Sequence, residues 1–267
     1  MMEEKQLRYK NAILNYKITG NGNTIVLLHG FGEDSRIWDG IAEGLQLKYQ
    51  LLIPDITGSG KSTLLPGNNI GMEDYAESIF SILTKENIQE CVMIGHSMGG
   101  YIALAFAQKY PELLKALGLF SSSAFADDEA KKEARTKAIT FIRENGSSAF
   151  LKTSIPGLFA DAEKSKEDIE ALLEKGKQFS PKALIQYYQA MINRPDRTTV
   201  LKTIKLPVLF LMGQHDKAVL FDHSLAQSYL PNLSHINVLR QSAHMGMLEE
   251  KEKSFSTLAH FLQSVYV

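Results

Sequence analysis

Short apolar runs alternate with longer amphipathic stretches along most of this chain. The runs are rich in aliphatic and β-branched residues and predict buried strands at 24–28, 50–54, 91–94, 116–120, 206–212 and 234–239, after an N-terminal strand pair within 7–18. Between them, the pattern predicts helices at 36–45, 72–86, 98–109, 221–229 and 249–265. Strands that are apolar on both faces and alternate with helices predict an α/β protein, with a mostly parallel central sheet flanked by helices.

The segment 122–199 interrupts this alternation. Its composition becomes charged and helical, as in the runs 127–133 and 163–168, and prolines punctuate it. We expect a helical lid (cap) of four helices, inserted in a core domain made of residues 1–121 and 200–267. Its charged residues are expected to face solvent, Arg143, Arg194 and Arg197 among them. Its large apolar side chains are expected to face the sheet or a pocket: Phe141, Phe150, Ile155, Leu158, Phe159, Tyr187, Tyr188 and Met191.

Composition narrows the class of protein. A formal net charge of −1 over 267 residues gives no electrostatic basis for binding nucleic acid. The sequence has a single cysteine, Cys91, which lies in an apolar run. A single cysteine excludes an internal disulfide framework and a cysteine-rich metal site. The N-terminus lacks the features of a signal peptide, and no apolar run is long enough to span a membrane. We therefore expect a cytoplasmic protein that acts on a small molecule. Its oligomeric state is left open.

The segment Gly95-His96-Ser97-Met98-Gly99-Gly100 carries the first chemical signal. It lies between a predicted strand and a predicted helix, and Gly-x-Ser-x-Gly in that context is the pattern of a nucleophile elbow. A serine on such a turn adopts a strained backbone, and the flanking glycines leave room for strand and helix. Ser97 is therefore the candidate nucleophile. The N–H of Met98, at the start of the helix, is a candidate donor to an oxyanion.

A serine nucleophile needs a base and an acid that orients the base. In parallel sheets, functional groups gather beyond the carboxyl ends of the strands. Asp216 follows the predicted strand 206–212, and His244 follows the predicted strand 234–239. We predict a triad of Ser97, Asp216 and His244. Asp222 is the alternative acid, and it is disfavoured because it lies at an apparent helix start.

With these motifs in place, the chain resembles the α/β-hydrolase superfamily, in particular small lidded serine esterases and lactonases. The resemblance covers nearly the whole length and rests on five segments: His29-Gly30-Phe31-Gly32, 55–62, 95–100, 213–216 and 243–245. It implies the α/β-hydrolase fold with a helical lid insertion, and Phe31 as the second oxyanion donor beside Met98. It also implies a triad that uses no cofactor and no metal.

The resemblance and the triad together predict hydrolysis of a small to medium carboxylic ester, with a lactone or thioester as further options. The alternatives are a triad-bearing small-molecule sensor that signals through a protein partner, and a carbon–carbon bond hydrolase or perhydrolase of the same fold. A serine at position 97 disfavours haloalkane dehalogenase and epoxide hydrolase activity, since the enzymes of this fold with those activities use an aspartate nucleophile. The apolar content of 122–199 suggests a mainly apolar acyl pocket.

Three nearby polar residues have structural interpretations. His29 is expected to organise its own loop, His96 to pack or form part of a pocket wall, and Asp55 to hold its own loop. The segment Gly60-Lys61-Ser62 resembles the end of a phosphate-binding loop, but that motif requires a glycine where Asp55 stands. Nucleotide binding is therefore not expected.

Overall fold

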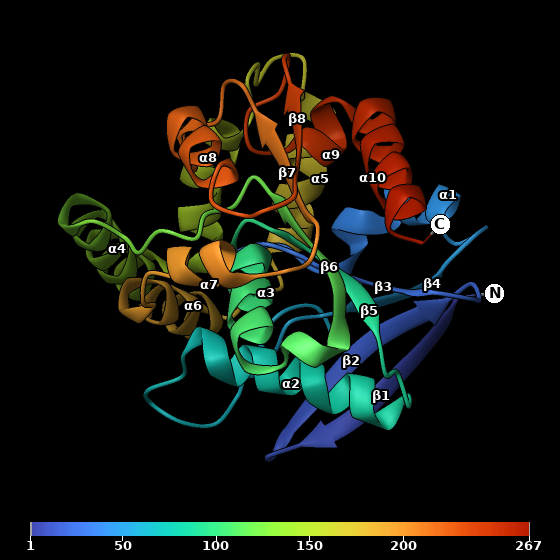
Figure 1. Ribbon diagram of the computed structural model, residues 1–267. Helices are drawn as coiled ribbons and strands as arrows, with labels where there is room; N and C mark the ends of the chain where they lie inside the picture. Colours follow the sequence, from blue (N-terminus) through green and yellow to red (C-terminus); the bar gives the residue numbers. More distant parts are fainter. Residues whose placement is uncertain (1, 267) are drawn as a thin grey trace.

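The computed structural model describes residues 2–266, and its centre is one eight-stranded sheet (Figure 1). The strand order is β1-β2-β4-β3-β5-β6-β7-β8. The first two strands pair antiparallel with their neighbours, and all the other pairs are parallel. The strands are β1 (Glu3–Tyr9), β2 (Ala12–Thr19), β3 (Thr24–Leu28), β4 (Gln50–Pro54), β5 (Cys91–His96), β6 (Leu114–Phe120), β7 (Val208–Gly213) and β8 (Ser234–Leu239).

Helices cover both faces of the sheet, as the sequence pattern predicts (Figure 1). On one face α1 (Asp39–Leu45) packs against α10 (Lys251–Val265), and on the other α2 (Met72–Lys85) packs against α3 (Met98–Lys109). Helix α8 (Phe221–Ser228) connects β7 to β8. The central strands β3, β4, β5 and β7 are buried along nearly their whole length, which explains why they read as continuous apolar runs.

Two predicted helices are each divided in the structure. The expected helix 36–45 is a 3-10 turn, η1 (Ser35–Trp38), followed by α1. The expected helix 249–265 is α9 (Gly246–Glu249) and α10, with a non-helical backbone at Glu250 between them, where φ is −131° and ψ is 60°. The Glu250 carboxylate accepts a hydrogen bond from the Gln241 N–H, 2.9 Å away. The division therefore lets Glu250 hold the loop that follows β8.

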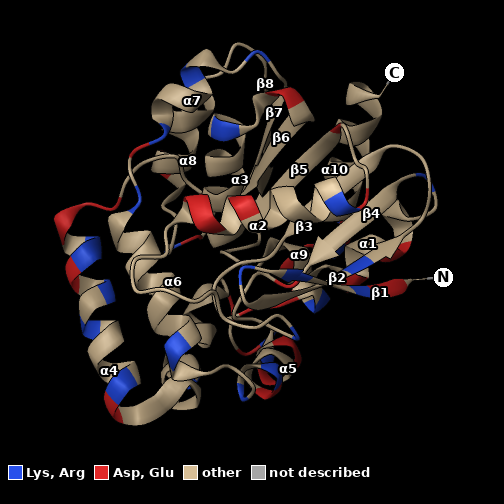
Figure 2. Ribbon diagram, turned by 90° about the horizontal axis from the view of Figure 1, so that it is seen from below, with Lys and Arg blue, Asp and Glu red and all other residues tan. Residues whose placement is uncertain are grey.

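Four further helices lie between β6 and β7: α4 (Glu129–Ser154), α5 (Lys166–Gly176), α6 (Pro181–Asn193) and α7 (Thr198–Thr203). A short 3-10 helix, η3 (Ile155–Leu158), follows α4. Helix α4 is interrupted at Gly146, whose φ is +84°. Charged residues of both signs, mostly basic, lie along α4 (Figure 2), consistent with the solvent-facing surface expected for this segment. The expectation for Phe141 is wrong, since that ring is 38% exposed.

The solvent-facing expectation also fails for two arginines of this segment, Arg194 and Arg197. Arg194 is buried, donates to the Asp127 carboxylate at 2.9 Å and stacks on the ring of Tyr101. The same carboxylate accepts from Arg135 at 2.6 Å. Arg197 is buried and pairs with Glu73. Buried charges require partners, and these partners are too far away in sequence to be read from a local pattern. Arg143 is exposed, as expected.

None of the helices within residues 2–266 is long and apolar enough to cross a membrane.

Cys91 is buried in β5, and burial raises the pKa of its thiol to about 12. A thiol in this environment stays protonated and is a poor nucleophile.

We predict that Asp127→Asn lowers the free energy of unfolding by about 3 kcal/mol, because it leaves two arginines without their carboxylate. Burial raises the pKa of Asp127, but the two arginines outweigh it and the pKa is lowered overall. The stabilisation is therefore full above about pH 5 and lost as the pH falls through the lowered value. Urea unfolding at pH 7 and at a series of pH values down to about 2.5 measures both effects. Glu133→Gln, in an exposed pair with Lys137 on the same helix, is the control and should unfold like wild type; an equal loss in both variants would contradict the prediction.

Candidate functional site

Ser97 lies on a strained turn between β5 and α3. Its φ is +51° and its ψ is −117°, a conformation that side-chain-bearing residues rarely adopt. The Ser97 N–H donates to the Phe120 carbonyl at 2.9 Å, so the hydrogen bonding between β5 and β6 continues up to the turn. The Ser122 hydroxyl donates to the Ser97 carbonyl at 2.7 Å. The sheet therefore holds the turn from both sides, which is what a strained turn requires.

The turn packs directly against the loop that follows β3. A Cβ atom on Gly99 would lie 2.5 Å from the Leu28 carbonyl oxygen and 2.6 Å from that of His29. Only a glycine allows this approach. Met98 is the first residue of α3, so its N–H has no partner within the helix. The loop that carries Phe31 and the turn that carries Met98 are therefore neighbours.

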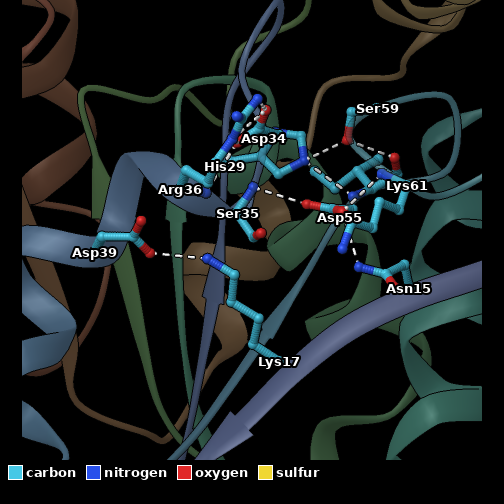
Figure 3. Close-up of polar contacts among 11 residues, drawn as sticks. Asn15, Lys17, His29, Asp34, Ser35, Arg36, Asp39, Asp55, Ser59 and Lys61 are labelled. Carbon is cyan, nitrogen blue, oxygen red and sulfur yellow. Dashed lines mark hydrogen bonds and ion pairs between the residues drawn. The ribbon is translucent and has the colours of Figure 1, made fainter. Parts of the chain in front are cut away.

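Side-chain hydrogen bonds hold the loops that follow β3 and β4 together (Figure 3). The Asp55 carboxylate accepts from the Ser35 and Lys61 amides, both at 2.9 Å, and from the Asn15 side chain at 3.1 Å. His29 Nδ1 lies 2.8 Å from the Gly30 carbonyl, and its Nε2 accepts from the Ile56 N–H at 2.9 Å. Both His29 nitrogens are thus occupied. His29 and Asp55 organise these loops, as their sequence positions suggest.

The loops after β7 and β8 bring an acid and an imidazole together. His244 Nδ1 lies 2.7 Å from Asp216 Oδ2, and Asp216 Oδ1 accepts from the Ala218 and Val219 amides at 2.8 and 2.9 Å. Both side chains are buried. Asp222, the alternative acid, is exposed at the start of α8.

The environment shifts the pKa of each partner in this pair. Burial lowers the pKa of His244, but the Asp216 carboxylate outweighs it and the pKa is raised overall. Burial raises the pKa of Asp216, but His244 and the two amides outweigh it and the pKa is lowered. The carboxylate therefore stays ionised and favours a proton on the imidazole.

The histidine loop touches the serine turn through His96. The His96 Nε2 donates to the His244 carbonyl oxygen at 3.0 Å, although the two residues are 148 positions apart in sequence. Within residues 2–266 the Ser97 hydroxyl makes no hydrogen bond of its own. Catalytic hydrogen bonds are often long without substrate. The structure thus joins Asp216 to His244 and sets the His244 loop beside the serine turn.

Glu33 is a site residue that the sequence did not reveal. Its carboxylate is buried, accepts from the Gly30 N–H at 2.6 Å and lies 3.0 Å from His96 Nδ1. His96 is therefore more than packing, because both of its ring nitrogens are engaged. The sequence holds only a weak indication of this role. Glu33 directly follows His-Gly-Phe-Gly, and a glutamate that is buried there needs a partner.

The helices between β6 and β7 cover this edge of the sheet. The Phe31 ring stacks on Tyr188 with 4.3 Å between centroids, and it contacts Phe150 and Tyr187 edge-on. The Leu158 carbonyl accepts from the His244 N–H at 2.9 Å. The segment thus contacts both the Phe31 loop and the His244 loop. Within residues 2–266 no three His, Cys, Asp or Glu side chains form a group that could hold a metal ion.

Residues 23–138 match the family model described as the alpha/beta hydrolase fold. A solved thermophilic esterase from Thermogutta terrifontis superposes over the full length of both chains, with a TM-score of 0.92 and 26% identity. This chain belongs to the α/β-hydrolase superfamily.

Two curated relatives show how far sequence similarity extends. A pimeloyl-[acyl-carrier protein] methyl ester esterase of Aeromonas salmonicida is 27% identical over 91% of this chain and 96% of its own length. An uncharacterized protein of Mycobacterium tuberculosis is 32% identical, but over 42% of this chain and 33% of its own length. The match to the mycobacterial relative thus spans only about a third of that protein.

We predict that Gly99→Ala lowers the free energy of unfolding by about 1–3 kcal/mol, because the added methyl group would overlap two backbone carbonyls that cannot move freely. Urea unfolding measures the change. Gly157→Ala is the matched control, since a Cβ there meets nothing within 4 Å. It should be as stable as wild type or slightly more stable. Equal stability of the two variants would contradict the prediction, because it would show that α3 can move away from the Leu28 and His29 carbonyl groups at little cost.

Proposed function

We propose that this protein is a serine hydrolase that cleaves small to medium carboxylic esters through an acyl-enzyme. Ser97 is the nucleophile, His244 the general base and Asp216 the acid that orients it. The observation that carries the proposal is the buried Asp216–His244 hydrogen bond, set beside a strained turn that presents Ser97. The two esterases compared above support the ester-cleaving part. Lactones and thioesters react by the same chemistry and extend the substrate class.

In the first half of the reaction, His244 Nε2 takes the proton of the Ser97 hydroxyl as Oγ attacks the ester carbonyl carbon. The carbonyl oxygen becomes an oxyanion, which the N–H groups of Phe31 and Met98 stabilise. Asp216 keeps the His244 Nδ1 proton in place and stabilises the imidazolium. The tetrahedral intermediate then breaks its bond to the alkoxy oxygen, which leaves as an alcohol with the proton from His244.

In the second half, water replaces the alcohol. His244 removes a proton from the water, the resulting hydroxide attacks the acyl carbon, and a second oxyanion forms in the same position. Its collapse releases the carboxylic acid and returns the proton to Ser97. No step consumes another reagent.

Residues 122–199 act as the lid of this site and select the substrate. Support comes from the aromatic contacts of Phe31 with α4 and α6 and from the Leu158–His244 hydrogen bond. Aromatic and aliphatic side chains dominate these contacts, which favours an apolar acyl group.

A fluorophosphonate probe is expected to label wild-type protein and to leave Ser97→Ala unlabelled. With 4-nitrophenyl esters of increasing acyl length and with acyl chains ending in a carboxylate, Ser97→Ala should lose at least about 10⁴-fold in kcat. Ser256→Ala, an exposed serine on α10, is the control and should behave like wild type.

Two results would contradict the proposal. Equal labelling of wild type and Ser97→Ala would exclude Ser97 as the nucleophile. Acylation that stops after a single turnover on every ester would favour the small-molecule sensor over the hydrolase.

We predict that kcat/KM rises with pH through an apparent pKa above 6.5, the ordinary histidine value, because His244 must be neutral to act as a base and its pKa is raised. Asp216→Asn removes the carboxylate that raises this pKa and leaves burial, which lowers it. The rise should therefore move to lower pH, while kcat falls by about 10⁴-fold. A pH–rate profile of wild type and Asp216→Asn measures the apparent pKa of each protein. A shift of this pKa toward higher pH in Asp216→Asn would contradict the prediction.

A further inference from the structure

A second imidazole–carboxylate pair, Glu33 with His96, lies behind the predicted triad. Its side chains are 6% and 0% exposed, and 3.0 Å separates Glu33 Oε2 from His96 Nδ1. Neither residue has a part in the proposed reaction. The two residues come from different segments: Glu33 lies in the loop that follows β3, and His96 is the last residue of β5.

The pair connects the two halves of the site. At one end, Glu33 accepts from the Gly30 N–H at 2.6 Å, next to Phe31. At the other end, His96 contacts the His244 carbonyl at 3.0 Å. One continuous chain of hydrogen bonds thus runs from the Gly30 amide through Glu33 and His96 to the backbone of His244.

Donor and acceptor chemistry determines where the protons in this chain lie. The His244 carbonyl can only accept, so His96 Nε2 carries a proton. A second proton must lie between Nδ1 and the Glu33 carboxylate. The carboxylate accepts a backbone N–H as well, which favours its ionised form. Burial raises the pKa of Glu33, but His96 and the Gly30 amide lower it below its ordinary value. The contact is therefore a hydrogen bond between a buried carboxyl group and a buried imidazole, and it orients the ring toward the His244 carbonyl.

We propose that Glu33 and His96 are positioning residues for ester hydrolysis: their hydrogen-bonded pair sets the distance between the oxyanion loop and His244. This inference rests on the proposed function. The base and the oxyanion donors must act on one substrate carbonyl, and an error of about 1 Å between such groups costs about 100-fold in rate. The pair supplies a direct side-chain link between these two loops.

Four variants test the role in hydrolysis of 4-nitrophenyl butyrate. His96→Phe fills the space of the ring but breaks the link, and Glu33→Ala removes the carboxylate. Each should lower kcat by about 10- to 100-fold and change KM by less than about 3-fold. Glu33→Gln should recover kcat to within about 5-fold of wild type, because its amide oxygen can take the place of Oε2, the one Glu33 atom that contacts both Gly30 and His96. Glu77→Gln, on α2 among Tyr9, Lys10 and Lys109, is the matched control and should leave kcat unchanged.

A measurement that does not depend on activity accompanies the kinetics. In protein with ¹⁵N-labelled histidine, the His96 Nε2–H that donates to the His244 carbonyl should give a signal protected from exchange with water, assigned by its loss in His96→Phe. Glu33→Ala should weaken this protection, because the ring loses the carboxylate that orients it. Circular dichroism at the assay temperature reports the folded fraction of each variant.

The outcomes separate this inference from the proposed function. If wild type hydrolyses no ester and Ser97 is not labelled, the proposed function fails, whatever the state of His96. If wild type is active and the folded variants His96→Phe and Glu33→Ala keep its kcat, the positioning role is overturned. A loss of kcat that only follows the folded fraction, or a His96 ring N–H in wild type that exchanges freely with water, overturns it too.

Discussion

Two backbone segments meet where β3 and β5 end, at Gly99 in the first turn of α3 and at the carbonyl groups of Leu28 and His29. The other features of the site depend on this contact. It brings the Phe31 loop to the start of α3, and it leaves Ser97 on a turn with positive φ that the β5–β6 hydrogen bonds hold in place. A strained conformation persists only where its surroundings hold it from several sides. Here sheet, helix and loop all do so.

The same edge of the sheet explains how distant residues meet. The parallel strands β5, β7 and β8 end there, so the residues after them, Ser97, Asp216 and His244, come close although they span much of the chain. The loop of His244 has little regular structure, and three other residues hold it. Asp216 contacts the His244 ring, His96 donates to the His244 carbonyl, and the Leu158 carbonyl accepts from the His244 N–H. Glu249 accepts from the neighbouring Ala243 and Met245 amides. These hydrogen bonds offset the entropy cost of ordering a loop.

Local signals carried most of the prediction from sequence. The inner strands β3, β4, β5 and β7 are predicted well because they are buried on both faces. Asp216 and His244 could be predicted to lie together because each follows a strand whose end can be located. Family membership follows from those motifs. The roles of Glu33, His96, Asp127 and Arg194 could not be found in this way. Each has a partner far along the chain, and a local pattern does not distinguish a buried paired charge from an exposed one. The divisions of the helices expected at 36–45 and 249–265 were missed because each lies beside a hydrogen bond to a loop distant in sequence. The Ser35 N–H donates to the Asp55 carboxylate, and the Glu250 carboxylate accepts from the Gln241 N–H.

The carboxylates of the two imidazole–carboxylate pairs share one electrostatic role in the proposed reaction. The pKa of each carboxyl group is lowered, so Asp216 and Glu33 are ionised before reaction. Asp216, Glu33 and Glu249 all raise the pKa of His244, in that order. In a low-dielectric site these carboxylates therefore favour the imidazolium that forms on His244 as the oxyanion appears. Glu33 also contacts His96, so one carboxylate supports both the charge on His244 and the link between the two loops.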